Sequence, residues 1–400
     1  MRMAYPMLKG VVTLLTLALL SCGSGGEVKI GVIIPSEGSL GDYGFQIISG
    51  IELAEKEIQS ETNPDKKLKK KYTVYYENES ADPSKVDVAV DSFNRLKKKG
   101  VTAIIGAASS AATLALTPLA NESKIILLSP ASSSPEINKQ GDFVYRNYPS
   151  DTLEAQFLSN VIFSKCRMSK VLMVRSKNAY AEGITYELLG FARKVSFDLP
   201  NKVVKFEGDP AQVDFAAVVN EIVEIKPQAV FLGAYSDSLI PLIKEIRSRE
   251  ELKQMYIFTS SSFLPSKVAK ALGPETVENV LFTSYSWGVA NEEKRQEFIK
   301  NFEATYHFPP NIYAAAGYDA LKLLCTKLDG INHHIPGDVR LEMNREAYQG
   351  VLGETSFNKR GDVTRIPELF WMKGGVAVKT TDEDLEEIKK DILLNQSDSE

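Results

Sequence analysis

The 400-residue chain has only three cysteines and three histidines, which leaves little material for a metal centre. Cys166 and Cys325 lie far apart and lack the short spacing of metal ligands, so the sequence predicts two separate thiols. A disulfide between them is the alternative outside the cytoplasm. His333 and His334 are adjacent in a loop flanked by glycine and proline, with no third ligand nearby. The sequence therefore predicts neither a bound metal ion nor a cofactor.

The usual motifs of catalysis are also missing. There is no Gly-x-Ser-x-Gly elbow, no Gly-x-x-x-x-Gly-Lys-Ser/Thr loop and no His-Glu-x-x-His pair. Gly38, Gly41 and Gly44 recur at every third position, which differs from the dinucleotide-binding fingerprint. A serine nucleophile would need a positioned base, for which Asp151 and Glu182 are the available carboxylates. An enzyme is therefore the least favoured function.

The chain has no excess of positive charge, since its formal net charge is −5, and this argues against nucleic-acid binding. Its long apolar run, Val11–Leu20, is too short to span a bilayer, which takes about 20 residues. The run follows Arg2 and Lys9, as in a secretory signal peptide. No second long apolar stretch follows, so we expect no other segment to span a membrane.

Cys22 lies two residues after the end of this run, and Leu19-Leu20-Ser21-Cys22 resembles the bacterial lipobox. The resemblance implies that residues 1–21 are a lipoprotein signal peptide and that Cys22 carries the lipid. Residues 22–27 then form a short tether, and the protein stays at the extracytoplasmic or periplasmic face of the cell envelope. A plain secretory signal with an incidental cysteine is the alternative.

Apolar strands and amphipathic helices alternate along the rest of the chain. Val28–Pro35 is typical of a strand buried on both faces, and Asp42–Gln59 has the periodicity of a helix. This alternation predicts βαβ units, parallel sheets and an α/β fold. The length exceeds what one hydrophobic core usually serves, so we expect two lobes. A change of character near Tyr148-Pro149-Ser150 is the first boundary between them.

The predicted lobes share the chain in alternating segments. Residues 28–149 and 285–354 form the N-terminal lobe, and residues 150–284 and 355–380 form the C-terminal lobe. Residues 381–400 form an acidic tail that we expect to be partly disordered.

Three clusters of small and hydroxyl residues directly follow apolar strands. They are Ala107–Ala111, Ser129–Ser134 and Thr259–Ser262. The carboxyl ends of parallel strands face the ligand crevice, and the helix after each loop adds free N–H groups. Serine also caps helices throughout proteins, so a single such loop would be uninformative. Three of them in equivalent positions predict a site for a carboxylate or a similar anion.

The order of the motifs resembles the periplasmic type I solute-binding proteins of the leucine/isoleucine/valine-binding branch. The matching segments are Lys29–Pro35 with Gly38–Gly44, Ile105–Gly106 with Ser109–Ser110, Ser129–Ala131, Tyr180–Gly183, Gly317–Ala320 and Phe357–Asp362. The resemblance implies two doubly wound parallel-sheet lobes joined by a multi-strand hinge. It also implies capture of an amino acid or related small carboxylate for an ABC transporter permease by a monomeric protein.

The resemblance also implies a pocket. Ser110 and Ser133, with Ser109 and Ser132 beside them, match the hydroxyl and backbone groups that hold a ligand carboxylate, and Ala131 matches a backbone contact. Asp151 matches an aspartate close to the ligand. The matching aromatic positions around the ligand are Tyr43, Tyr180, Tyr235 and Tyr313.

Ser261 departs from the family pattern, because it stands where the family has the glutamate that neutralises the ligand ammonium group. A buried ammonium without a carboxylate partner is costly. Either Asp151 replaces that glutamate or the ligand is not a simple α-amino acid. A sensory or cell-envelope regulatory module of the same fold is the alternative to transport. A disulfide of some family members is absent, since its positions are Ala81 and Ser109 here.

Overall fold

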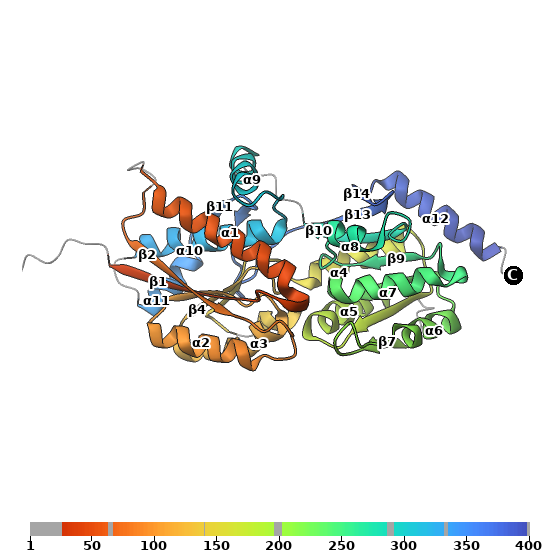
Figure 1. The fold of residues 1–400 in the computed structure, drawn as a ribbon, viewed down its shortest axis with the longest axis horizontal. Helices are drawn as coiled ribbons and strands as arrows, with labels where there is room; N and C mark the ends of the chain where they lie inside the picture. Colours follow the sequence, from red (N-terminus) through yellow and green to blue (C-terminus); the bar gives the residue numbers. More distant parts are fainter. Residues whose placement is uncertain are drawn as a thin grey trace, which may run out of the picture.

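The computed structural model describes residues 26–62, 67–139, 141–195, 202–285, 292–331 and 335–397. The predicted signal peptide, Cys22 and the His333-His334 pair lie outside these residues. The described chain forms two lobes that lie side by side (Figure 1). Each lobe is built on its own sheet with helices on both faces.

The first lobe contains a five-stranded sheet in the order β2-β1-β3-β4-β5, and all of its pairings are parallel. The strands are β1 (Glu27–Ile34), β2 (Lys71–Asn78), β3 (Ala103–Gly106), β4 (Ile126–Ser129) and β5 (Val144–Arg146). Strands β3, β4 and β5 are buried at every position. Their continuous apolar runs follow from this, because helices cover both faces of a parallel sheet.

Two groups of helices cover the first sheet. Helices α2 (Asp87–Lys99) and α3 (Ser110–Ser123) pack on one face. Helices α1 (Gly41–Ser60) and α10 (Ile312–Asp329) pack on the other, so segments far apart in sequence share one core (Figure 1). The remaining elements of this lobe are η1 (Gly38–Leu40), η2 (Pro135–Lys139), α9 (Glu292–Tyr306), α11 (Pro336–Met343) and the hairpin of β11 (Tyr348–Gly350) with β12 (Gly353–Thr355).

Helices α1 and α10 approach each other closely through Gly50 and Gly317. A Cβ atom at Gly317 would lie 2.3 Å from the Ile47 carbonyl oxygen, and one at Gly50 would lie 2.0 Å from the Ala314 carbonyl oxygen. Only glycine permits this distance, because any larger residue would force the helices apart. The Gly317–Ala320 motif of the sequence therefore has a packing role.

The second lobe contains a seven-stranded sheet in the order β14-β13-β10-β9-β8-β6-β7. The strands are β6 (Val171–Ser176), β7 (Val203–Phe206), β8 (Ala229–Gly233), β9 (Tyr256–Thr259), β10 (Val280–Tyr285), β13 (Pro367–Lys373) and β14 (Val376–Lys379). The central pairings are parallel, whereas β13 and β14 add an antiparallel edge. The chain crosses between the lobes after β5, after β10 and between β12 and β13. This architecture confirms the predicted two-lobed α/β fold.

Helices cover both faces of this second sheet as well. The described elements are α4 (Asp151–Ser159), the π-helix η3 (Asn160–Lys165), α5 (Ala179–Ala192), α6 (Phe215–Ile225), α7 (Ser236–Ser248), η4 (Glu250–Leu252), α8 (Pro265–Leu272) and α12 (Asp382–Ser397). Helices α4, α5 and α12 share one core, and α6, α7 and α8 share the other. No described helix is both long enough and apolar enough to cross a membrane.

Most of the predicted acidic tail forms helix α12 (Asp382–Ser397), and its last three residues lie outside the described chain. Leu385, Ile388 and Ile392 are buried in the core of the second lobe. Their spacing of three and four residues places them on one face of the helix. The acidic residues of the opposite face suggested a solvated tail, whereas the buried apolar stripe anchors it.

Cys166 and Cys325 are both free and buried, one in each lobe, which confirms the prediction of two separate thiols. Burial raises the pKa of the Cys166 thiol to about 12, because a thiolate is poorly solvated in an apolar core. Within the described residues no group of histidine, cysteine and carboxylate side chains could hold a metal ion.

Candidate ligand-binding site

The three serine-rich loops meet at the interface of the lobes. The Ala107–Ala111 segment follows β3 and opens α3, and the loop after β4 lies beside it. The Ser260–Ser262 loop follows β9 in the other lobe. One expectation was wrong in detail, since the loop after β4 leads into the short 3-10 helix η2 rather than an α-helix. The carboxyl ends of both sheets therefore face one interface, as the fold class requires.

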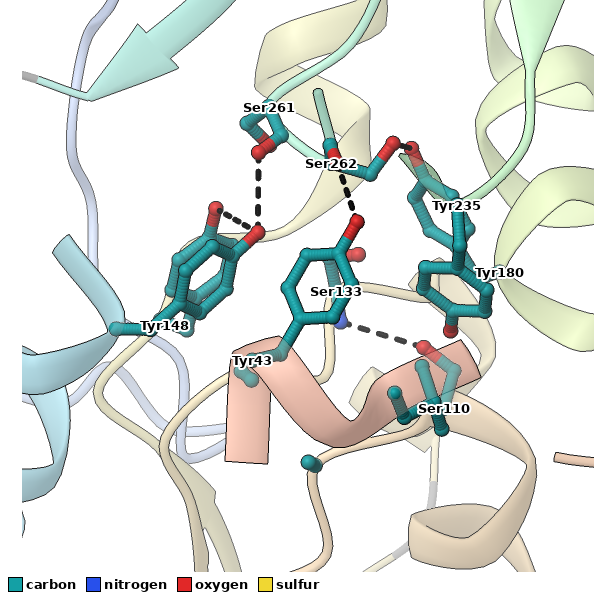
Figure 2. A pocket seen from close by; sticks show the side chains of 12 residues that line it. Tyr43, Ser110, Ser133, Tyr148, Tyr180, Tyr235, Ser261 and Ser262 are labelled. Carbon is teal, nitrogen blue, oxygen red and sulfur yellow. Dashed lines mark hydrogen bonds between the residues drawn. The ribbon is translucent and has the colours of Figure 1, made fainter. Parts of the chain in front are cut away.

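A small cavity lies between these loops (Figure 2). Its lining residues are Leu40, Tyr43, Ala108, Ser110, Ala131, Ser133, Tyr148, Tyr180, Tyr235, Ser261, Ser262 and Tyr313. About 30 Å³ of it admits the centre of a water-sized sphere, which is room for a few water molecules. An amino acid therefore requires the lobes or the tyrosine rings to move apart.

The predicted site residues divide into those that line the cavity and those behind it. Tyr43, Ser110, Ala131, Ser133, Tyr180, Tyr235, Ser261 and Tyr313 line it. Ser109, Ser132 and Asp151 are buried outside the lining. The Ser109 hydroxyl accepts from the Ala112 N–H as the cap of α3, and the Ser132 hydroxyl bonds the Ala107 carbonyl. Leu40, Ala108, Tyr148 and Ser262 were not predicted as site residues, although Ala108 and Ser262 belong to the first and third of the predicted loop clusters.

Ser110 and Ser133 form the hydroxyl side of the cavity. The Ser110 oxygen accepts from the N–H groups of Ser133 (3.3 Å) and Ser134 (3.2 Å), so it ties two loops together (Figure 2). Because the oxygen is used as an acceptor, the hydroxyl hydrogen remains available for a ligand oxygen. Ser110 also begins α3, where the helix dipole favours a negative charge.

Glu79 holds the loop before α3 in place, and the sequence analysis did not indicate this residue. Its buried carboxylate accepts from the N–H groups of Ala108 (2.7 Å) and Ser109 (3.0 Å). Burial raises the pKa of Glu79 to about 7, while these hydrogen bonds oppose the shift. The side chain therefore holds the Ala107–Ala111 segment in place and leaves the first turn of α3 to face the cavity.

Tyrosine rings from both lobes enclose the rest of the cavity. Tyr148 and Tyr313 stack with centroids 5.5 Å apart, and Tyr180 and Tyr235 stack at 5.0 Å. Tyr43 meets Tyr235 and Tyr313 edge-on at 5.7 and 5.2 Å. Burial raises the pKa of Tyr43, Tyr180 and Tyr313, so their hydroxyls stay protonated and uncharged. Such rings provide an apolar surface with hydroxyl groups at the edge.

Direct contacts join the lobes at the cavity and at its rim. The Tyr43 hydroxyl, from α1 of the first lobe, donates to the Ser262 carbonyl at 2.5 Å and accepts from the Ser236 N–H at 3.1 Å. Lys267 of the second lobe forms ion pairs with Asp42 of the first lobe and Asp237 of its own. The Tyr43 contacts are buried, whereas Asp42 is about half-exposed.

Two buried carboxylates stand behind the second-lobe wall of the cavity. Asp151 and Glu154 lie one turn apart on α4, and both are fully buried. The Glu154 carboxylate accepts from the Ser261 N–H at 2.6 Å and from the Ser261 hydroxyl at 3.0 Å. Burial raises the pKa of both carboxyls, and the charge of Glu154 raises that of Asp151 further.

Known proteins share this architecture. A family model described as periplasmic binding protein matches residues 27–366. The chain belongs to the periplasmic binding protein family. Among curated proteins, the "Leu/Ile/Val-binding protein homolog 1" of Brucella melitensis is 24% identical over 354 residues, which cover 87% of this chain and 91% of that protein. These matches confirm the resemblance to the type I leucine/isoleucine/valine-binding branch.

Solved structures of other periplasmic binding proteins have the same fold. The leucine-binding protein LivK of Thermotoga maritima has a TM-score of 0.77 at 23% identity, covering 88% of this chain and 98% of its own. LivJ of Streptococcus pneumoniae in complex with isoleucine has a TM-score of 0.76 at 22% identity, covering 88% and 100%. A Rhodopseudomonas palustris solute-binding protein in complex with benzoate has a TM-score of 0.74 at 18% identity, covering 89% and 95%.

Proposed function

We propose that this periplasmic binding protein captures an amino acid or a similar small carboxylate between its lobes and passes it to an ABC importer. The cavity at the lobe interface carries the proposal. It combines the Ser110 hydroxyl at the first turn of α3 and the Ser133 hydroxyl in the adjacent loop with five tyrosines contributed by both lobes. The first group suits a carboxylate, and the rings suit an apolar side chain. Protein relatives whose names include leucine, isoleucine and valine support this ligand class.

In this proposal the ligand binds first to the first lobe, through Ser110, Ala131 and Ser133. The lobes then close about their three connecting segments, and Tyr180 and Tyr235 cover the ligand. Closure is driven only by contacts that exist in the closed state, and the Tyr43 bonds to Ser236 and Ser262 are among those that the protein itself contributes. The protein works as a monomer that meets the importer's permease, and it catalyses no reaction.

Calorimetric titration with amino acids and small carboxylates tests the proposed ligand class. We expect binding by the unaltered protein and at least about tenfold weaker binding by Ser110→Ala, since a hydrogen bond to a charged group is lost. Ser123→Ala, at the opposite end of α3, is the matched control and should bind normally. Absence of binding across the panel would contradict the proposal, and unchanged affinity in Ser110→Ala would remove Ser110 from the site.

The lipid anchor at Cys22 belongs to the same proposal, and it keeps the protein at the extracytoplasmic face of a membrane. The lipobox-like Leu19–Cys22 segment supports it. Mass spectrometry of the mature N-terminal peptide from membranes is the measurement. We expect a chain that begins at a lipid-modified Cys22, and an unmodified Cys22 would contradict the anchor.

A further inference from the structure

Glu154 contacts the loop of Ser261, the residue that stands where the family has a glutamate. Four donors surround its carboxylate group, which is fully buried. The Ser261 N–H and hydroxyl come from the loop after β9, at 2.6 and 3.0 Å. The other two donors, the Tyr285 hydroxyl at 3.2 Å and the Thr283 hydroxyl, come from β10. Three hydroxyl groups and one backbone N–H thus donate to Glu154. This set of donors matches an ionised carboxylate, which is an acceptor only.

Ser261 connects this carboxylate to the cavity. Its side chain lines the cavity, whereas Glu154 lies behind it. Because the Ser261 hydroxyl donates its hydrogen to Glu154, its oxygen can act only as an acceptor toward a ligand. A hydroxyl that donates to a carboxylate is also polarised into a stronger acceptor. Ser261 therefore presents an electron-rich oxygen where a loop glutamate would present its own charge.

The surrounding charges favour a cation at this point. None of the twelve lining residues carries a charge. Asp151 stands one turn before Glu154; burial and the charge of Glu154 raise the pKa of its carboxyl group, and a hydrogen bond from Ser133 opposes this shift. The nearby Arg146 guanidinium is engaged by Asp362 at 2.5 Å. The Glu154 carboxylate behind an uncharged wall makes the cavity attractive to an ammonium group.

We propose that Glu154, acting through the Ser261 hydroxyl, is the positioning residue that makes the cavity select an ammonium-bearing carboxylate over a plain carboxylate. The inference rests on the proposed function and narrows its ligand class to α-amino acids. The ligand ammonium group donates a hydrogen bond to the Ser261 hydroxyl. The negative charge of Glu154, which lies behind Ser261, compensates the positive charge of the ammonium group without direct contact. The carboxylate absent from the loop is thus supplied by α4.

The experiment compares each amino acid with the same molecule lacking its amino group. Leucine with 4-methylpentanoate and phenylalanine with 3-phenylpropanoate are titrated calorimetrically into the full protein, and the affinity ratio within each pair is the readout. The unaltered protein should bind at least one amino acid about 100-fold more tightly than its partner compound. Glu154→Gln should lower that ratio about tenfold or more by weakening the amino acid alone.

A swap variant separates charge from structure. In Glu154→Gln/Ser261→Glu the carboxylate moves from α4 to the loop, and the affinity ratio should recover towards that of the unaltered protein. Glu57→Gln is the matched control, because it removes a hydrogen-bonded carboxylate of the first lobe outside the cavity and should leave the ratio unchanged. Circular dichroism melting confirms that each variant is folded.

The outcomes distinguish the two proposals. Equal weakening of both members of a pair in Glu154→Gln would give Glu154 a structural role only and overturn the inference. Equal or tighter binding of the plain carboxylates by the unaltered protein would also overturn it, while the capture of small carboxylates would stand. Binding of no amino acid and no small carboxylate, these four compounds included, would overturn the proposed function and the inference together.

Discussion

Replacing Asp362 with alanine is expected to lower the free energy of unfolding by about 3–5 kcal/mol. Asp362 lies in the segment between β12 and β13 and accepts from the Nε of Arg146, at the end of β5, at 2.5 Å. The Arg146 side chain is fully buried and also donates to the carbonyls of Ser134 (2.9 Å) and Ser132 (3.4 Å). Without Asp362 the guanidinium remains buried and loses its carboxylate partner.

Urea denaturation followed by circular dichroism measures this loss. Asp382→Ala is the matched control, because it removes an exposed ion pair with Lys165 and should cost less than about 1 kcal/mol. A second variant, Arg146→Met/Asp362→Leu, should recover much of the loss, since both charges of the buried ion pair are removed. If Asp362→Ala were as stable as the control variant, the ion pair would not be structurally important.

The second large effect is expected on ligand affinity. Tyr43→Phe removes a hydroxyl that joins the lobes and leaves the buried Ser236 N–H without its partner, while the Ser262 carbonyl still accepts from the Ser236 hydroxyl. The cost falls on the closed arrangement and amounts to about 1–3 kcal/mol for one buried donor. Ligand binding should therefore weaken about tenfold or more, because each 1.4 kcal/mol corresponds to about tenfold in affinity.

Calorimetric titration gives the affinity of Tyr43→Phe, and X-ray scattering in solution gives the separation of the lobes. Tyr76→Phe is the matched control, since its hydroxyl binds Glu55 on the surface of the first lobe alone. The Tyr43 variant should be more open than the control at the same ligand concentration. Unchanged affinity and unchanged scattering in Tyr43→Phe would show that its hydroxyl does not hold the lobes together.

Local patterns predicted much of the cavity. Strands β3, β4 and β9 are short apolar runs, and each ends in a cluster of small and hydroxyl residues. The rule that strand carboxyl ends face the crevice was sufficient to bring Ser110, Ser133 and Ser261 to one interface. The family resemblance predicted the tyrosines, and four of them line the cavity together with Tyr148, which it did not indicate.

The tail and the carboxylates show where local patterns failed. The many acidic residues after Asp382 suggested a solvated tail, yet three apolar residues at helical spacing anchor helix α12 to the second lobe. Glu154 was invisible for a different reason. It lies 107 residues before Ser261, and no glutamate occurs near Ser261 in the sequence itself.

By itself the sequence determined the α/β class, the two lobes and the serine-rich loops, because these depend on periodicity and on residues adjacent in the chain. Only the tertiary structure decided which distant groups share one small volume. The Tyr43 contact spans 219 residues, and the Arg146–Asp362 pair spans 216. Burial gives such contacts their energy, and burial depends on how the lobes pack against each other. For that reason the carboxylate behind Ser261 could not be predicted, whereas the tyrosines were predicted from the family resemblance.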